Sequence, residues 1–285
     1  MQQTITITKV KNPNGARVIP GFGLSMGVTI TFLSLVVLIP LASLLLCAAK
    51  LSFSDFITIV TSRSVMCGYG VSLSCALFAA LINCIFGLIL AWILVRYNFP
   101  YKRFLDGLIE LPFALPTAVA GISLTSIYSD GGWIGGLFDK FGIKISYTRT
   151  GITIAMIFIG IPFIVRAVQP VLESLDREYE EAADILGSNS FNTFCKVIFP
   201  EIFPALLGGF GLALARGIGE YGSVVFIAGN IPFKTQIAPL LIMSKLEQYK
   251  YEDATAIALV LLVISFLIMI VINTLQGHLY KIIKR

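Results

Sequence analysis

Six apolar segments, each about twenty residues long or longer, recur along this chain of 285 residues. They cover residues 24–47, 69–95, 108–128, 151–172, 202–228 and 254–276. A helix needs about 20 predominantly apolar residues to cross the hydrocarbon core of a bilayer. Since lipid offers no hydrogen-bond partners, an isolated spanning segment must satisfy its backbone groups internally, as a helix does. The sequence therefore predicts an all-α membrane protein with about six transmembrane helices.

Composition excludes a water-soluble domain, because 56% of the residues are hydrophobic, only 13% are charged, and the mean hydropathy is +0.88. The net charge of +5 comes from basic residues scattered singly through the connections, so membrane lipid is expected as a partner and nucleic acid is not. The chain has one histidine, His278, and its five cysteines show no metal-ligand spacing. We expect no metal, no cofactor and no catalytic residue.

The apolar runs imply one domain, residues 24–276, between a polar N-terminal arm (1–23) and a basic C-terminal tail (277–285). The first run is longer than the core of a signal peptide, so it is predicted to be a retained span. With six spans, both termini share one side of the membrane. The connections on that side carry 12 basic residues and the opposite ones 8, which favours termini on the cytoplasmic or ATP side.

Residues 172–200 form the one long charged segment between two apolar runs. If residues 172–186 are helical, their apolar side chains share one face and their acidic side chains the other. Gly187 suits a left-handed turn, and Ser188, Asn189 and Ser190 offer caps for a second apolar helix that ends at Pro200. Such a hairpin could lie on lipid headgroups, but its acidic face would be repelled by anionic lipid, which favours a protein partner.

The same hairpin resembles the EAA signature of ABC importer permeases, in which EAA is followed by three residues, glycine, nine residues and Ile-x-Leu-Pro. The spacing fits without a gap, and Val197 and Phe199 replace one apolar residue by another. The resemblance implies a coupling helix that docks on a cytoplasmic ATPase. The residues it assigns to coupling are Glu181, Ala182, Ala183, Gly187, Val197, Phe199 and Pro200.

The third apolar run contains Pro112 and Pro116, and Thr117 follows directly. Each proline removes one backbone hydrogen bond, and a break at membrane depth is tolerated facing protein or a water-filled cavity. The alternatives are a kink that serves packing and a break that lines or gates a pathway. This run also resembles the corresponding helix of sulfate and molybdate permeases.

The fifth apolar run carries Arg216 and Glu220, four residues apart and interspersed with glycines. Ionised side chains within a span cost about 2.5–3.5 kcal/mol each, so they indicate either a structural ion pair or a transport pathway. Residues 219–224 and 226–230 resemble the T-type subunits of sulfate and thiosulfate importers.

These features favour a transport subunit that moves sulfate or thiosulfate in a bacterial inner membrane or a plastid membrane. The chain has no phosphate-binding loop of the Gly-x-x-x-x-Gly-Lys-Ser/Thr type, so ATP must bind elsewhere. The resemblance implies an ABC ATPase dimer, a paralogous W-type permease subunit and a sulfate-binding protein as partners. The alternatives are a molybdate or tungstate permease, a self-contained anion channel or ion-driven carrier, and a membrane enzyme.

The basic-residue bias generates a topology prediction. In a background without the five native cysteines, Ser188→Cys should react with a membrane-impermeant thiol reagent from the ATP side. Labelling restricted to the opposite side would contradict this orientation.

Overall fold

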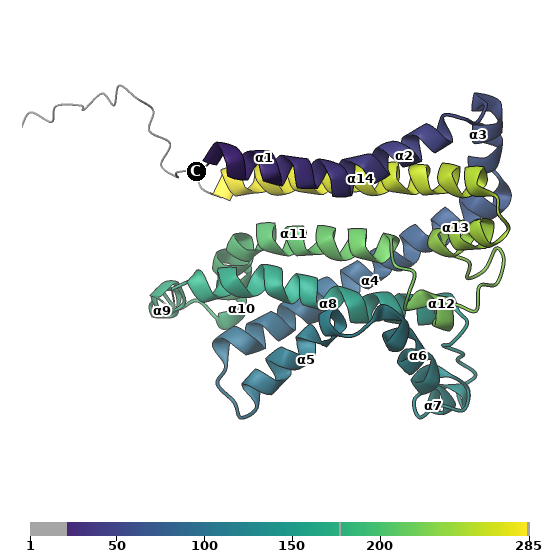
Figure 1. Ribbon diagram of the computed structural model, residues 1–285. Coiled ribbons are helices and arrows are strands. Elements are labelled where there is room, and N and C mark those ends of the chain that lie inside the picture. Colours follow the sequence, from purple (N-terminus) through teal and green to yellow (C-terminus); the bar gives the residue numbers. More distant parts are fainter. Residues whose placement is uncertain (1–21, 177, 284–285) are drawn as a thin grey trace, which may run out of the picture. The chain divides into compact units, whose positions relative to one another are not determined.

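A computed structural model describes residues 22–176 and 178–283, and every regular element in these ranges is helical (Figure 1). The chain divides into two compact units, the first ending at Ala49 and the second beginning at Lys50. The expected polar arm lies outside the described residues up to position 21, and Phe22 is already helical. At the other end, the last helix runs through position 277 to Ile283 without a break, so most of the expected tail is helical.

The first unit contains one apolar helix. It consists of α1 (Phe22–Leu33), a π-helical turn (Ser34–Leu38) and α2 (Ile39–Ala48). Together they form a candidate span of 27 residues, and Pro40 is accommodated in the first turn of α2. Its apolar side chains point in all directions, as lipid contact allows.

The second unit contains the remaining helices. Its long helices are α4 (Arg63–Arg96), α8 (Arg149–Ser174), α11 (Phe199–Ile218) and α14 (Tyr251–Ile283). Its shorter helices are α3 (Phe53–Val60), α5 (Lys102–Ala114), α6 (Thr117–Tyr128), α7 (Gly135–Asp139), α9 (Glu178–Ile185), α10 (Ser190–Thr193), α12 (Val224–Ile227) and α13 (Ala238–Glu247), with a second π turn at Phe194–Ile198.

The core of this unit is the packing of α8 against α4 and α11. Ile164 of α8 is fully buried, and a Cβ at Gly87 of α4 would lie 2.7 Å from its Cβ. A Cβ at Gly209 of α11 would lie 3.1 Å from the Cα of the same isoleucine. Helices in membranes associate through close packing, and small residues permit it. The two glycines therefore let three backbones approach one another around Ile164.

The number of spans agrees with the expectation. Among the described residues, five helices are long and apolar enough to cross a membrane, and the bent pair α5–α6 is a candidate sixth span. The break expected in the run 108–128 is present, because the two helices meet at 111°, and the correction concerns the start, since α5 begins at Lys102 rather than at Leu108. Pro116 restricts the residue before it, and Leu115 is accordingly extended, with ψ 135°.

The helix expected over 172–186 is also divided. Leu172 belongs to α8 and is fully buried, Leu175 is extended with ψ 113°, and α9 begins at Glu178. The Leu175 carbonyl accepts a 3.5 Å contact from the Arg96 guanidinium of another helix. The continuous amphipathic helix was therefore a wrong prediction, since a tertiary partner replaces the next helical hydrogen bond.

In the second half of the segment, the helix is longer than expected. The helix that starts at Ser190 does not stop at Pro200 but continues to Ile218 as one candidate span of 29 residues. The π turn at Phe194–Ile198 directly precedes the proline, so the helical hydrogen-bond pattern already changes where Pro200 lacks an N–H, and the helix continues past it. This helix then ends ten residues before the predicted position 228.

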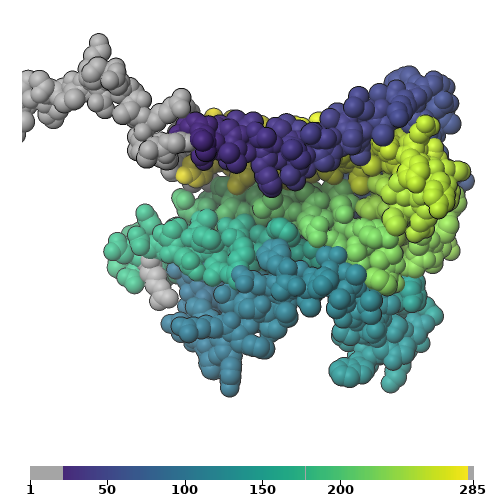
Figure 2. Space-filling model, in the orientation of Figure 1, coloured from purple at the N-terminus to yellow at the C-terminus, as the bar shows by residue number. Residues whose placement is uncertain are grey.

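The bend separates α5 from α6 and α7. Figure 2 shows the blue-teal segments of α5 and of α6 with α7 as two separate projections with open space between them. This concave side belongs to the second unit alone. The predicted proline break, with Pro112 in α5 and Pro116 at the start of α6, joins the two projections.

The glycine contacts generate a prediction on stability. Gly87→Ala should destabilise the fold by about 1–3 kcal/mol, because the added methyl overlaps Ile164. Gly70→Ala is the matched control in the same helix, where a Cβ meets nothing within 4 Å and the helix gains up to about 1 kcal/mol. Thermal unfolding in detergent should show opposite shifts, and equal shifts would contradict the close packing.

Candidate functional site

The turn between α9 and α10 is fixed by local hydrogen bonds. Gly187 has φ +77°, its N–H donates to the Asp184 carbonyl at 2.9 Å, and the Ser188 N–H donates to the Ala183 carbonyl at 3.0 Å. These two bonds form a Schellman motif, which needs a left-handed residue. The Asn189 side chain then caps α10 by accepting from the Asn192 N–H at 2.7 Å. The predicted glycine turn and its cap are confirmed.

The α9 surface is apolar at its tip. Ile185 and Leu186 are each 86% exposed, and Tyr179 and Phe191 are also exposed. Three glutamates occupy the first turn of α9, where the helix dipole favours negative charge. Glu181 and Ala182 are exposed, Ala183 is half-buried, and Val197, Phe199 and Pro200 are half-buried in the helix that follows. Exposed apolar side chains that lie together in this way are typical of a surface that binds another protein.

Both sides of the turn are attached to the last turn of α4. Arg96, with a side chain only 10% exposed, pairs with Glu180 of α9 at 2.6 Å and lies over the Trp92 ring. Trp92 in turn meets Phe194 edge-on, with ring centroids 5.5 Å apart. An apolar groove of about 740 Å³ continues from these rings along α4 and α11. The turn therefore has a defined orientation relative to α4.

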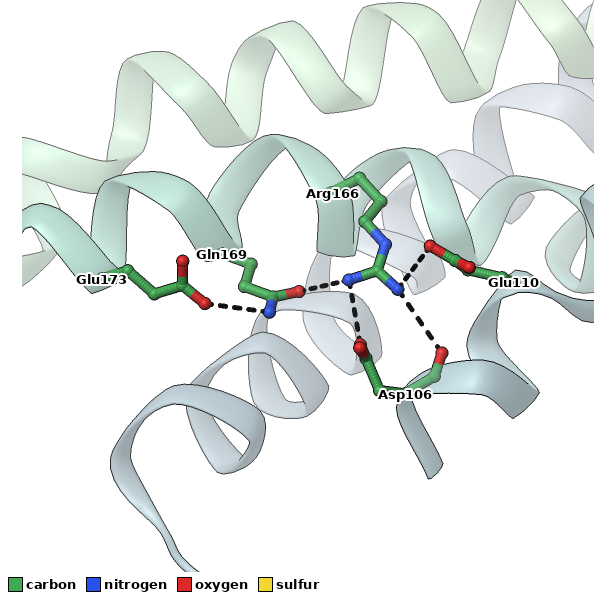
Figure 3. Close-up of polar contacts among 5 residues, drawn as sticks. All are labelled: Asp106, Glu110, Arg166, Gln169 and Glu173. Atoms are coloured by element: carbon green, nitrogen blue, oxygen red, sulfur yellow. Dashed lines mark hydrogen bonds and ion pairs between the residues drawn. The ribbon is translucent and has the colours of Figure 1, made fainter. Parts of the chain in front are cut away.

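A charged cluster joins α8 to α5 (Figure 3). The Arg166 guanidinium pairs with Asp106 at 2.9 Å and with Glu110 at 2.7 Å. It also donates to the Gln169 side-chain oxygen at 2.7 Å, and the Gln169 amide donates to Glu173 at 3.0 Å. Because arginine presents several donors in a fixed planar geometry, one side chain holds both α5 carboxylates.

Two of the segments predicted for a pathway, the start of α6 and the turn after α11, meet beyond the bend. Pro116 caps α6, and a Cβ at Gly222 would collide with the Thr117 side chain that follows it. Pro112 lies one turn earlier, inside α5. Gly121 of α6 similarly faces the Ser223 backbone, because a Cβ added at Gly121 would lie 2.8 Å from the Ser223 Cα. The start of α6 thus packs directly on the turn that contains Glu220.

Arg216, in the last turn of α11, and Glu220, two residues beyond the end of the helix, form an ion pair of 3.2 Å. The Arg216 side chain is 46% exposed, whereas that of Glu220 is 2% exposed. The other Glu220 oxygen accepts from the Ser223 N–H at 3.0 Å and from its hydroxyl at 3.2 Å. The buried carboxylate therefore organises the turn, and the cation faces open space.

Comparison with known proteins identifies the family. Residues 83–285, more than half of the chain, match the family model described as binding-protein-dependent transport system inner membrane component. The chain belongs to this family. It is a multi-pass transporter permease, not an enzyme. The description of its family places such permeases in transport systems that depend on a binding protein.

Curated relatives of this permease are similar over most of their length. The sulfate transport system permease protein CysT of Escherichia coli (strain K12) is 48% identical over 262 residues, which cover 92% of this chain and 95% of the relative. A probable sulfate transport system permease protein cysT of Chlorokybus atmophyticus is 51% identical over 249 residues, covering 87% of each chain.

Solved structures share the fold of the permease. A bacterial ABC transporter involved in the import of the acidic polysaccharide alginate superposes with a TM-score of 0.76 at 15% identity, covering 90% of this chain and 96% of that chain. The MetNI methionine ABC transporter, in inward-facing conformations, gives 0.57 at 15% identity, covering 80% and 99%. The predicted fold class is confirmed.

Sequence reasoning missed two arginines of this permease. Arg166 lies inside the apolar run 151–172, and a cation in such a run was a sufficient signal for a functional or paired residue. Arg96 follows the second run and gave no signal, because its partner Glu180 is distant in sequence. Within the described ranges, no group of three potential metal ligands lies close together.

The asymmetric burial of the ion pair generates a prediction. Arg216→Ala leaves a buried carboxylate with the Ser223 donors alone and should cost about 1–3 kcal/mol of stability. Adding Glu220→Gln removes the charge, keeps an acceptor for Ser223, and should recover most of the loss. Thermal unfolding of the two single variants and the double variant measures the coupling energy between Arg216 and Glu220. Losses of stability that simply add would contradict an energetically coupled ion pair.

Proposed function

We propose that this permease is the T-type membrane subunit of an ABC importer for sulfate or thiosulfate. The observation that carries the proposal is the 48–51% identity, over most of the chain, to proteins named as sulfate transport system permeases. Molybdate and tungstate are the runner-up substrates, and the names of these relatives favour sulfate over them. A paralogous W-type permease and a sulfate-binding protein complete the proposed complex.

The turn between α9 and α10 is the proposed contact with the ATPase dimer. Its apolar tip at Ile185 and Leu186 is exposed, and the chain itself has no phosphate-binding loop. The Arg96–Glu180 pair and the Trp92–Phe194 contact support a rigid connection from this tip to α4. Movement of an ATPase would then displace a spanning helix rather than a flexible loop.

A second connection leads toward the proposed pathway. The α9 tip follows α8, Arg166 joins α8 to α5, and α5 ends at the proline break. Beyond the break, α6 packs on the turn that holds Glu220. We infer that Pro112, Pro116 and Thr117 act as the hinge of a gate. Arg216, half exposed beside this hinge, supplies a fixed positive charge for an anion.

The substrate is tested by complementation. Cells that lack their own sulfate importer should regain growth on low sulfate when this chain is supplied with its ATPase, W-type subunit and binding protein. A complex without this chain is the control. Restored molybdate-dependent activity without growth on sulfate would contradict the assignment.

The coupling role is tested at Gly187. Gly187→Val should strain the left-handed turn by about 1 kcal/mol or more and misdirect the tip, so sulfate uptake should fall while the protein still inserts. Gly277→Val is the control, because its Cβ position meets nothing within 4 Å. Unchanged uptake with normal ATPase binding would contradict a docking role.

A further inference from the structure

A small recess lies at the N-terminal end of α8. It has a volume of about 320 Å³ and is lined by Tyr147, Thr148, Arg149, Ile231, Lys234 and Thr235. The coupling turn follows the other end of this 26-residue helix, about 39 Å away along its axis. If α8 crosses the membrane once, the recess opens on the face where substrate arrives.

Two cations define the chemistry of the recess. The Arg149 Nε donates to the backbone carbonyl of Lys234 at 3.0 Å, which holds the guanidinium against the segment that carries the lysine. Both side chains are exposed, and no aspartate or glutamate is among the lining residues. The planar guanidinium presents further donors that match the oxygens of an oxyanion. The Thr148 and Thr235 hydroxyls donate to the Ile145 and Ala228 carbonyls, so the two positive charges are what the lining offers an anion.

Neighbouring charges do not cancel these two. Lys144, in the preceding loop, is paired with Asp130 at 2.9 Å, and this hydrogen bond and charge raise the pKa of the lysine. Arg63 lies 5.8 Å above the ring of Phe233, the residue before Lys234, and adds positive charge. The surroundings therefore stay positive, as attraction of an anion requires.

The recess is built on hydrogen-bonded backbone. The Tyr147 N–H donates to the Ile227 carbonyl at 2.8 Å, and the Thr235 hydroxyl donates to the Ala228 carbonyl at 2.6 Å. Both acceptors are buried residues at the end of α12, seven and eight residues after Glu220. The recess wall is thus continuous with the turn beside the proposed gate.

We propose that this recess binds a divalent tetrahedral oxyanion, sulfate in the first instance, as an arrival site on the face opposite the coupling turn. The choice of sulfate rests on the proposed function. Binding is weak and sensitive to salt, because both cations are exposed to water. The site raises the local anion concentration next to the gate.

The experiment uses the full transporter in liposomes, without binding protein. In a cysteine-free background, Ile231→Cys on the recess wall reports access to an anionic and a cationic methanethiosulfonate reagent. Sulfate should slow modification more than chloride of equal ionic strength does. Arg149→Gln with Lys234→Gln should abolish this protection. It should also lower the rate of modification by the anionic reagent, relative to that by the cationic reagent, by about threefold or more. Lys140→Gln with Lys250→Gln, exposed lysines outside the recess, is the charge-matched control.

Three results would overturn the site: protection no greater than by chloride, protection unchanged in the Arg149/Lys234 double variant, and protection that requires binding protein, which would indicate a protein-docking surface. If the cysteine-free chain does not assemble, the sulfate-specific rise in melting temperature of the native transporter and the double variant gives the same comparison. Sulfate protection in a transporter that imports no sulfate would overturn the proposed function and leave the site standing. Sulfate uptake without protection of the cysteine by sulfate would overturn the site and leave the proposed function standing.

Discussion

The close contact of α8 with α4 and α11 around Ile164 is the interaction on which the second unit depends. Gly87 and Gly209 let both neighbouring backbones approach this one side chain. Hydrophobic burial adds little between helices that are already surrounded by lipid, so such fitted contacts supply much of the packing energy. With α8 held on both sides, Arg166, two residues further along, is directed at α5, and Gln169 of α8 accepts a hydrogen bond from the same guanidinium.

Helix α8 connects distant parts of the permease. One end of α8 leads to the coupling turn, and the other end forms the wall of the basic recess. Between them, the Arg166 cluster attaches the half-helix α5, whose continuation α6 packs on the Glu220 turn. A helix with polar attachments at both ends can transmit displacement, because a close-packed interior moves as a unit rather than deforming continuously.

Local sequence signals succeeded where the structure is decided locally. Gly187 turns left-handed because the residues around it close a Schellman motif, and Asn189 caps the next helix within three residues. The signals failed where a distant partner decides. Leu175 leaves the helix where Arg96, 79 residues away, contacts its carbonyl, and Pro200 stays inside a helix because a π turn precedes it.

The sequence by itself determined the membrane-spanning segments, the glycine turn and the proline break, since apolar length, left-handed φ and a missing N–H are properties of individual residues or short runs. The family could also be recognised from it, through the spacing around Glu181 and Gly187. Only the tertiary structure decided which charges meet. Arg96 with Glu180, Arg166 with Asp106, and Arg149 beside Lys234 come from segments far apart in the chain. Their pairing follows from how the helices pack, and packing in lipid depends on small residues whose contacts no linear pattern specifies.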